Sequence, residues 1–436
     1  MDARKPPVDT SLEYDMASKR ELPHTASSIG SRIRPSTNQL QSSITGAGTR
    51  ELRLAPANDD VHARRRALHV ATKSLKARSY RIGRVLCLKA LRMSYDCVIA
   101  TRNRLDALRM SIPLILKQDV APEQLIIVDS SEDHDAVRTE VDSISERLGF
   151  KSTVVAKSDA SNSARQRNLG LQFVKAPVVM LPDDDSMWHG GFASNVLKIY
   201  EADVRRQVGG VTGIGVPEPP PELGQVTYKK STFATAKGTL QPYRKSIENR
   251  FFPHPFGLIA EATWTENIDV VDDINSRRVP YITGFRMSFR TEALRQVGFD
   301  ETLGYAAGYA YHEDYDVSLR LERLGYALVS AEGAKVCHYS FPGNRGAGYN
   351  YGFSVIANSV YICRKTIGGD TQIYPLLERY LKYKLSLYAS RFYSSHGREV
   401  FQGAFDAWRN RSRLLDADEA SLADAYKDLC DQYIRK

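Results

Sequence analysis

Three consecutive carboxylates, Asp183, Asp184 and Asp185, follow an apolar run of four residues, Val178–Leu181. Such a run is typical of a buried strand, and ligands bind at the carboxyl ends of strands in open α/β sheets. Adjacent carboxylates repel one another unless a cation neutralises them. Hard divalent ions such as Mg²⁺ are often shared between carboxylates and a substrate phosphate. The chain is therefore expected to bind a metal ion together with a phosphate group.

Two earlier apolar runs, at 98–100 and 125–128, also end in polar residues. Thr101, Arg102 and Asn103 follow the first run, and groups of these types suit a base, a ribose or a pyrophosphate. Asp129 follows the second run, where a carboxylate suits hydrogen bonds to ribose hydroxyls or to a base. A single polar residue at a strand end is more often a turn former than a ligand. The ordered set is a stronger indication of a nucleotide site than any one segment.

An acidic pair, Glu313 and Asp314, stands where a helix is predicted to begin, at 314–324. Acidic residues are common in a first helical turn because they suit the helix dipole. Here, however, the pair follows a loop rich in Gly and Tyr, at 304–311, that could hold an acceptor sugar. His338 ends a predicted strand at 334–339. It is either a structural residue or a ligand for a metal or a pyrophosphate.

Strands and helices are expected to alternate over the central part of the chain, which predicts a mostly parallel sheet with helices on both faces. The predicted strands are 98–100, 125–128, 152–155, 178–181, 208–214 and 334–339. The predicted helices are 105–116, 136–148, 163–174, 193–204, 291–297, 314–324, 355–366, 374–392 and 415–435. Residues 217–279 are rich in Pro and irregular, which favours an ordered loop that covers a substrate.

The net charge of +9 over 436 residues comes from the first part of the chain, since residues 1–94 carry 18 Lys/Arg and 8 Asp/Glu. Residues 1–60 are expected to be disordered. Residues 61–94 form a basic connector that either docks on anionic lipid or is simply solvated. A nucleic-acid-binding protein would carry this charge on its folded domain, so no nucleic-acid partner is expected.

The predicted helix at 374–392 interleaves apolar and basic residues. It is expected to pack one face on the rest of the protein and to expose a basic edge. Five widely spaced cysteines indicate a reducing compartment. Neither a signal peptide nor a membrane-spanning run is recognisable. The protein is therefore expected in the cytoplasm, either free or peripherally attached to the inner face of the cytoplasmic membrane.

In this order, the segments resemble the family 2 glycosyltransferases of the GT-A fold, over residues 95–365. Asp183–Asp185 is similar to the family's DXD motif, and Glu313–Asp314 to its ED motif. Further segments that resemble the family are 98–104, 127–131, 164–170, 284–290, 297–300, 358–365 and, more loosely, 402–408. The 358–365 and 402–408 segments are similar to those of bacterial members that assemble polysaccharides in the cell envelope. Two departures from the usual motifs are Pro182 and Arg102.

The resemblance implies a Rossmann-like GT-A domain at 95–366, with a nucleotide-sugar half at 95–215 and an acceptor half at 216–366, followed by a helical region at 367–436. It also implies an inverting hexosyltransferase that moves a sugar from a nucleotide-diphosphate sugar to a glycan or lipid-linked glycan acceptor. Mg²⁺ or Mn²⁺ would be held by Asp183, Asp185 and His338. Asp314 would be the general base, with Glu313 second. The donor would be bound by Thr101, Arg102, Asn103, Asp129, Arg165, Asn168, Asp183, Asp184 and Gly284.

Two alternatives stay open on the sequence alone. The first is a nucleotidyltransferase that forms the sugar nucleotide, although such enzymes usually carry a Gly-rich loop after the first strand and residues 101–104 contain no Gly. The second is a degenerate GT-A protein that binds without catalysing. A phosphatase with an Asp nucleophile is disfavoured, because the carboxylates follow a late strand rather than the first.

Overall fold

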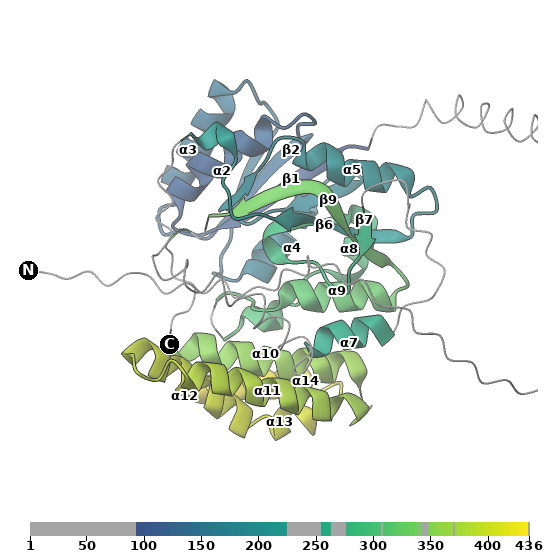
Figure 1. The fold of residues 1–436 in the computed structure, drawn as a ribbon. Helices are drawn as coiled ribbons and strands as arrows, with labels where there is room; N and C mark the ends of the chain where they lie inside the picture. Colours follow the sequence, from purple (N-terminus) through teal and green to yellow (C-terminus); the bar gives the residue numbers. More distant parts are fainter. Residues whose placement is uncertain are drawn as a thin grey trace, which may run out of the picture. The chain divides into compact units, whose positions relative to one another are not determined.

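The computed structural model describes residues 93–224, 254–262, 276–306, 308–339, 341, 348–368 and 371–434 (Figure 1). These residues all belong to one compact unit. The tail predicted at 1–60 and all but the last two residues of the connector predicted at 61–94 lie outside the described residues. So does most of the irregular segment predicted at 217–279. The described residues of that segment form the 3₁₀ helix η1 (Pro221–Leu223), the helix α7 (Pro255–Ala262) and the strand β7 (Ser276–Arg278).

A nine-stranded sheet forms the centre of the unit, in the order β3-β2-β1-β4-β8-β6-β9-β5, with β7 paired to β9. The other strands are β1 (Tyr95–Thr101), β2 (Gln124–Asp129), β3 (Thr153–Lys157), β4 (Val178–Leu181), β5 (Ser186–Trp188), β6 (Val208–Gly215), β8 (Met287–Arg290) and β9 (Ala327–His338). The strand predicted at 178–181 is confirmed residue for residue. The strand predicted at 334–339 is the end of the much longer β9.

The sheet is parallel only in part. Strands β3, β2, β1 and β4 run parallel, as predicted, but β8 runs antiparallel between β4 and β6. Only the four residues 182–185 join β4 to β5, and a parallel crossover needs a dozen or more. β5 therefore cannot return beside β4, and it pairs antiparallel with the end of β9 instead. The sheet is thus more mixed than predicted, and the departure begins at the carboxylates.

Helices cover both faces of the sheet because alternate residues of each strand point to opposite faces. In β1, Cys97 and Ile99 pack with α2 (Leu105–Leu116), α3 (His134–Arg147) and α5 (Phe192–Ala202). Val98 points to the other face and packs with α4 (Ser163–Phe173), α8 (Thr291–Val297) and α9 (Glu313–Arg323). The boundaries predicted for the helices at 105–116 and 291–297 agree with those of α2 and α8.

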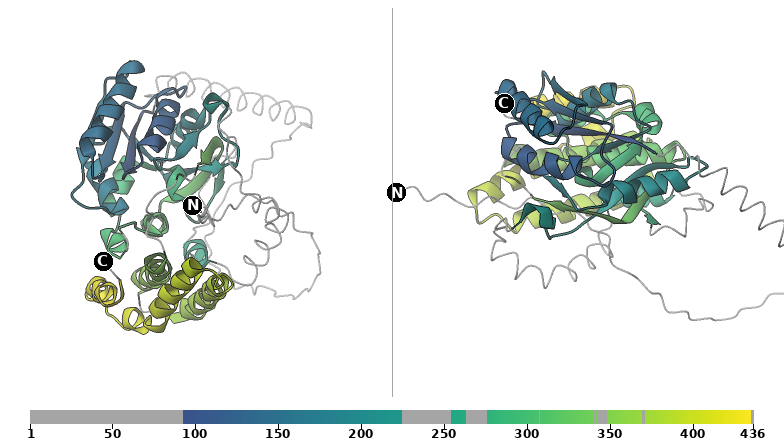
Figure 2. Two further views of the ribbon diagram at one scale, coloured as in Figure 1. Left: turned by 90° about the vertical axis from the view of Figure 1, so that its left-hand side faces the viewer. Right: turned by 90° about the horizontal axis from the view of Figure 1, so that it is seen from above.

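The C-terminal helices form a further layer beyond α9, as the views of Figures 1 and 2 agree. They are α10 (Tyr349–Ile367), α11 (Tyr374–Ala389), α12 (Ser395–Arg409), α13 (Ser412–Leu415) and α14 (Leu422–Tyr433). Short 3₁₀ helices are η1 (Pro221–Leu223), η2 (Gly284–Arg286), η3 (Glu301–Gly304) and η4 (Thr371–Ile373). The single closing helix predicted at 415–435 is wrong in its extent, since α13 and α14 are separate, and α12 was not predicted.

The helices α10 and α12 cross at backbone contact. A Cβ atom on Gly352 of α10 would lie 1.9 Å from the carbonyl oxygen of Val400. A Cβ atom on Gly403 of α12 would lie 2.0 Å from the carbonyl oxygen of Tyr349. Glycine is therefore required at both positions for the two helices to approach so closely. None of the described helices is long and apolar enough to cross a bilayer.

We expect Gly403→Ala to destabilise the protein by about 1–3 kcal/mol, because the added methyl group overlaps a backbone carbonyl that cannot rotate away. The matched control is Gly257→Ala in α7, where the nearest atom to the new methyl group is a Tyr281 ring carbon at 3.9 Å. Thermal unfolding followed by circular dichroism should show a lower Tm for Gly403→Ala only. Equal Tm values for the two variants would contradict the close crossing.

Candidate active site

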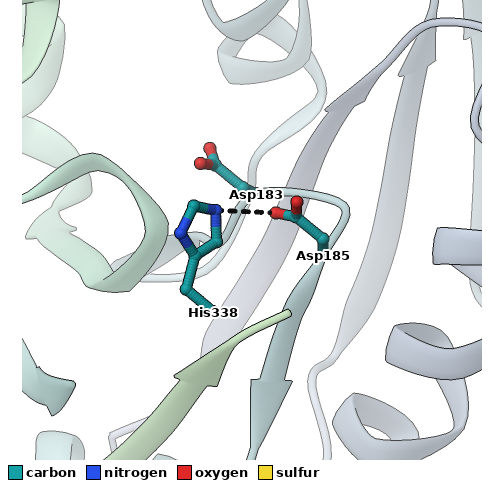
Figure 3. A group of neighbouring side chains, drawn as sticks. All are labelled: Asp183, Asp185 and His338. Carbon is teal, nitrogen blue, oxygen red and sulfur yellow. Dashed lines mark ion pairs between the residues drawn. The ribbon is translucent and has the colours of Figure 1, made fainter. Parts of the chain in front are cut away.

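The three carboxylates lie in the tight connection between β4 and β5. Asp184 and Asp185 are buried, whereas Asp183 is partly exposed. Because β5 pairs antiparallel with β9, Ser186 lies opposite His338. The pairing brings Nε2 of His338 to 3.1 Å from Oδ1 of Asp185 (Figure 3). The backbone register of two short strand segments thus joins the carboxylates to a histidine that lies some 150 residues later in the sequence.

Asp183, Asp185 and His338 form a group that could hold a metal ion. One ligand atom from each residue lies within 4.8 Å of the other two. The His338 ring also stacks on Phe285, with the ring centroids 4.8 Å apart, which restricts the orientation of the imidazole. Two carboxylates and one imidazole are a suitable ligand set for a divalent cation such as Mn²⁺. The three residues predicted as metal ligands are therefore close enough together to act as a set.

Arg104, in the loop after β1, contacts two of the three carboxylates. Its guanidinium donates to Oδ1 of Asp184 at 2.5 Å, to Asp185, and to the carbonyl oxygen of Phe341 at 3.1 Å. Thr101 Oγ1 donates to the other oxygen of Asp184 at 2.8 Å. Burial raises the pKa of Asp184 to about 7, and Arg104 and Thr101 act in the opposite direction. Arg104 supplies positive charge where carboxylates would otherwise repel one another.

Arg167 of α4 connects the DXD motif to the acidic pair. Its guanidinium is buried, lies 2.7 Å from Oδ1 of Asp183, and also forms an ion pair with Glu313. Ser163, one turn earlier on α4, donates its hydroxyl to Glu313 as well, at 3.2 Å. The first turn of α9 and the end of β4 therefore meet across a single arginine side chain.

The carboxylate of Asp314 accepts hydrogen bonds from two backbone N–H groups. Its Oδ2 accepts from the N–H of Gly284 at 2.9 Å, and its Oδ1 accepts from the N–H of Tyr315 at 2.9 Å. His312, at the N-cap of α9, has a left-handed backbone with φ of 67°. That turn directs the chain into α9 so that both acidic residues fall in its first turn. Hydrogen bonds from two N–H groups fix the orientation of the Asp314 carboxylate.

Asp129 forms a second polar cluster at the end of β2. Its oxygens accept from Ser131 N–H at 2.9 Å and contact Nδ1 of His134 at 2.8 Å. Ser131 in turn accepts from the N–H of Asn103 at 2.7 Å, so the ends of β1 and β2 are tied together. A cavity of about 490 Å³ opens beside this cluster. Its lining includes Asn103, Arg104, Ser131, Asp133 and Phe341.

The remaining predicted donor-binding residues contact other parts of the protein. Arg102 donates to Ser161 Oγ at 2.6 Å, and Arg165 pairs with Asp159 at 2.6 Å on the surface. Asn168 donates to the carbonyl oxygen of Phe299 and accepts from its N–H. Asn168 thus fixes the chain before η3, and the structure does not bring its side chain to the carboxylates.

Two arginines of the site, Arg104 and Arg167, were not predicted as functional residues. Both belong to segments that the motifs included, at 101–104 and 164–168. The signal that could have identified them is charge balance, because three adjacent carboxylates in a partly buried turn require positive side chains as well as a cation. Spacing alone could not assign their partners, since Arg104 and Asp184 are 80 residues apart in the sequence.

A cluster of aromatic and histidine rings lies behind the acidic pair. His254 stacks on Tyr315 with the centroids 5.0 Å apart, and its Nε2 lies 2.9 Å from the hydroxyl of Tyr380 on α11. His312 lies edge-on to His254 at 6.2 Å. Burial and the nearby Lys384 lower the pKa of both histidines, that of His312 to about 3. The cluster joins α7, α9 and α11 with both imidazoles neutral.

Fold and site together define an α/β protein with an acidic centre at the strand ends whose side chains could hold a cation. Residues 96–258 match the model of glycosyl transferase family 2, and residues 250–411 match that of glycosyl transferase family group 2. The chain is a glycosyltransferase of family 2, and its sheet flanked by helices is the GT-A fold. No curated protein matches the chain.

Solved glycosyltransferase structures resemble this one at low sequence identity. A mannosyltransferase from Pyrobaculum calidifontis, solved with GDP-Man and Mn²⁺, is 15% identical over 84% of this chain and 95% of its own, with a TM-score of 0.44. TarS of S. aureus, solved as residues 1–349 with UDP-GlcNAc, is 12% identical over 78% of this chain and 91% of its own, with a TM-score of 0.43. GalNAc-T7, solved with UDP, GalNAc and Mn²⁺, is 14% identical over 78% of this chain and 55% of its own, with a TM-score of 0.44.

We expect the neutral histidines to make the fold sensitive to acid. Each folded-state pKa lies below the ordinary histidine value, so below about pH 6.5 the unfolded chain binds protons that the folded chain does not. The free energy of unfolding should therefore decrease as the pH is lowered below about 6.5, by up to about 1.4 kcal/mol per pH unit for each histidine. Urea unfolding at several pH values should show a shallower dependence for His254→Phe. An unchanged dependence would contradict the neutral buried state of His254.

Proposed function

We propose that the protein transfers a sugar from a nucleoside-diphosphate donor to a hydroxyl group of a glycan or lipid-linked glycan, with inversion at the anomeric carbon. The observation that carries this proposal is the position of Arg167 between Asp183 and Glu313. An inverting transfer needs a leaving-group site and a base on opposite sides of one reacting carbon. The ion pairs of Arg167 keep the metal motif and the acidic pair at the same centre.

The donor diphosphate is proposed to bind at Asp183, Asp185 and His338 through Mn²⁺ or Mg²⁺. The histidine nitrogen favours Mn²⁺, since Mg²⁺ prefers oxygen ligands alone. The cation would offset the negative charge that develops on the departing nucleoside diphosphate. The nucleoside is assigned to the cavity lined by Asn103, Ser131 and Asp133, whose polar groups can contact a ribose or a base, and Asp129 behind them orients Ser131.

Asp314 is the better candidate for the base. Glu313 is tied to Arg167 and Ser163, and a carboxylate held in such an ion pair is a poor proton acceptor. Asp314 accepts from two backbone N–H groups, which orient its carboxylate in the first turn of α9. In the proposed step Asp314 accepts the proton of the acceptor hydroxyl as that oxygen attacks the anomeric carbon. The bond from that carbon to the diphosphate oxygen breaks, and its electron pair leaves with the diphosphate.

The acceptor is assigned to the side of α9 that faces the Gly- and Tyr-rich segment before it. Tyr309, Tyr311 and Tyr351 form a row of rings there, with neighbouring centroids 4.9 and 5.2 Å apart. Flat aromatic faces with a polar hydroxyl suit the mixed apolar and polar surface of a sugar. The assigned place of action is the cytoplasm or the inner face of the cytoplasmic membrane, where nucleotide-activated donors and lipid-linked glycans meet.

We expect Arg104→Met to bind Mn²⁺ about tenfold more tightly than the wild type in the absence of nucleotide, a change of about 1.4 kcal/mol. The reason is that the Arg104 guanidinium and a divalent cation compete for the oxygens of the same carboxylate group. The measurement is a calorimetric titration with Mn²⁺. Arg102→Met is the matched control, because it removes the same charge from a side chain that contacts Ser161 instead. Unchanged Mn²⁺ affinity in Arg104→Met would rule out the competition.

The transferase assignment itself is tested by donor hydrolysis, in which water replaces the unidentified acceptor. Purified protein with Mn²⁺ is offered UDP-, GDP- and dTDP-sugars, and released nucleoside diphosphate is counted. We expect slow, metal-dependent release from one donor. Asp185→Asn should abolish metal-dependent donor binding. Asp314→Asn should lower the rate at least about a hundredfold and leave donor binding intact, because a base acts on the reacting hydroxyl rather than on the diphosphate.

The possible outcomes of these assays distinguish a wrong base assignment from a wrong reaction class. Full turnover in Asp314→Asn would overturn the base assignment alone. Release of inorganic pyrophosphate when a sugar phosphate and a nucleoside triphosphate are supplied would indicate a nucleotidyltransferase instead. Donor binding without hydrolysis in the wild type, together with no transfer to any glycan offered, would indicate a binding protein that has lost catalysis.

A further inference from the structure

The helices α11 and α12 form an antiparallel hairpin with an inner and an outer side. At its open end, Trp408 and Arg411 both donate to Glu378, at 3.2 and 2.8 Å. The inner side is buried through Leu377, Tyr380, Leu381, Leu385 and Tyr388 of α11 and Gly397, Val400, Gly403, Ala404 and Ala407 of α12. The exposed basic edge predicted for residues 374–392 is confirmed at Arg379 and Lys382.

The outer side of the hairpin carries a row of aromatic rings. Phe392, Phe401, Phe405 and Trp408 follow one another with centroid distances of 5.7, 5.9 and 5.7 Å. Phe392 is 50% exposed and Phe405 is 38% exposed, while Tyr393 beside them at the hairpin tip is 86% exposed. Phe401 and Trp408 are half-buried and pack against the core, so the exposed apolar surface of the hairpin comes from Phe392, Tyr393 and Phe405.

This concentration of apolar surface is local. Among the described residues, seven large apolar side chains are exposed, and three of them lie on this hairpin. The other four are Phe173, Val204, Tyr305 and Leu324, which lie on separate elements. Scattered single apolar side chains need no explanation, whereas a contiguous set indicates a surface that another molecule covers.

Positive charge accompanies the rings. Residues 374–413 contain eight Lys/Arg and three Asp/Glu, a surplus of five, although residues 95–436 as a whole sum to −1. The basic side chains are Arg379, Lys382, Lys384, Arg391, Arg398, Arg409, Arg411 and Arg413. Arg411 also stacks on Trp408, 4.5 Å from the ring centre. Arg379, Lys382, Arg398, Arg409 and Arg413 are exposed, whereas Lys384 lies over the buried Tyr380 and Arg411 pairs with Glu378.

We propose that the outer side of the α11–α12 hairpin docks on an anionic lipid bilayer. Aromatic rings enter the interface between head groups and acyl chains, and Lys and Arg are attracted to anionic head groups. A neutral glycan would bind the rings but would not account for the charge surplus. The basic residues also disfavour a second copy of the same surface, since two such surfaces repel each other.

The hairpin is joined directly to the helix that leads away from the active site. Asp406 on α12 accepts from the hydroxyl of Tyr349, the first residue of α10, at 2.8 Å. Shortly before α10 in the sequence, the N–H of Phe341 donates to Asp185 at 3.2 Å. A bilayer on the hairpin would therefore lie on the structural layer that supports the site. This is the surface from which a lipid-linked acceptor would approach.

The test is sedimentation of the full-length protein with lipid vesicles, without donor or acceptor, so that its outcome is independent of the proposed reaction. Vesicles contain either phosphatidylcholine alone or equal parts of phosphatidylcholine and phosphatidylglycerol. We expect binding to the mixed vesicles and about tenfold weaker binding for Phe392→Ser/Tyr393→Ser/Phe405→Ser. The basic segment before residue 93 is present in every variant, so its contribution is constant across the comparison.

Two further variants distinguish the contribution of positive charge from that of exposed apolar groups in general. Arg379→Gln/Lys382→Gln/Arg398→Gln/Arg409→Gln should bind more weakly and lose much of the wild type's sensitivity to salt. The matched control is Phe173→Ser/Val204→Ser/Leu324→Ser, which removes equally exposed apolar groups elsewhere and should bind like the wild type. Circular dichroism confirms that each variant is folded.

Three results would overturn the docking proposal. One is equal vesicle binding by the aromatic variant and the wild type. Another is equal binding to neutral and anionic vesicles. The third is weaker self-association in the aromatic variant with unchanged vesicle binding, measured by sedimentation velocity, which would identify the surface as a contact between copies of the chain.

Discussion

Three carboxylates at the end of β4 cannot remain ionised together in a buried site without positive charge beside them. Arg104 and Arg167 provide that charge from opposite sides, the first through Asp184 and Asp185 and the second through Asp183. Both arginines come from elements at the carboxyl ends of the parallel strands. The negative charge of the turn at Asp183–Asp185 therefore fixes the positions of two elements, the loop after β1 that carries Arg104 and the helix α4 that carries Arg167.

The same electrostatic requirement connects the two halves of the site. Arg167 is buried and uses its second nitrogen for Glu313, so the position of α9 depends on the arginine that balances Asp183. Glu313 ties the first turn of α9 to Arg167, while Asp314 next to it accepts from backbone N–H groups. The two acidic residues of the pair have different partners because they point from the first helical turn in different directions.

Residue patterns predicted the parts of the fold that depend on local periodicity. The helices α2 and α8 and the strand β4 have strong apolar periodicity and clear end signals, and their boundaries agree with the prediction. The helix α12 was missed because its buried positions include Gly397, Gly403 and Ala404, which carry little hydrophobic signal. They are buried because α10 approaches at backbone distance, and that contact is not encoded in the sequence of α12 itself. The pairing of β5 with β9, which delivers His338 to Asp185, is likewise a long-range property of the sheet.

The C-terminal layer takes part in the site through α9. Lys365 of α10 bonds to Asp300 and Asp316, at 2.6 and 2.8 Å, and Tyr380 of α11 bonds to His254 in the ring cluster behind Asp314. The first turn of α9 is thus held from the sheet side by Arg167 and from the helical side by these contacts. Because the same helical layer carries the aromatic and basic hairpin on its outside, whatever covers the hairpin acts on a layer already bonded to the helix of the proposed base. The position of α9 and the surface chemistry of α11 and α12 are therefore linked through one helical layer.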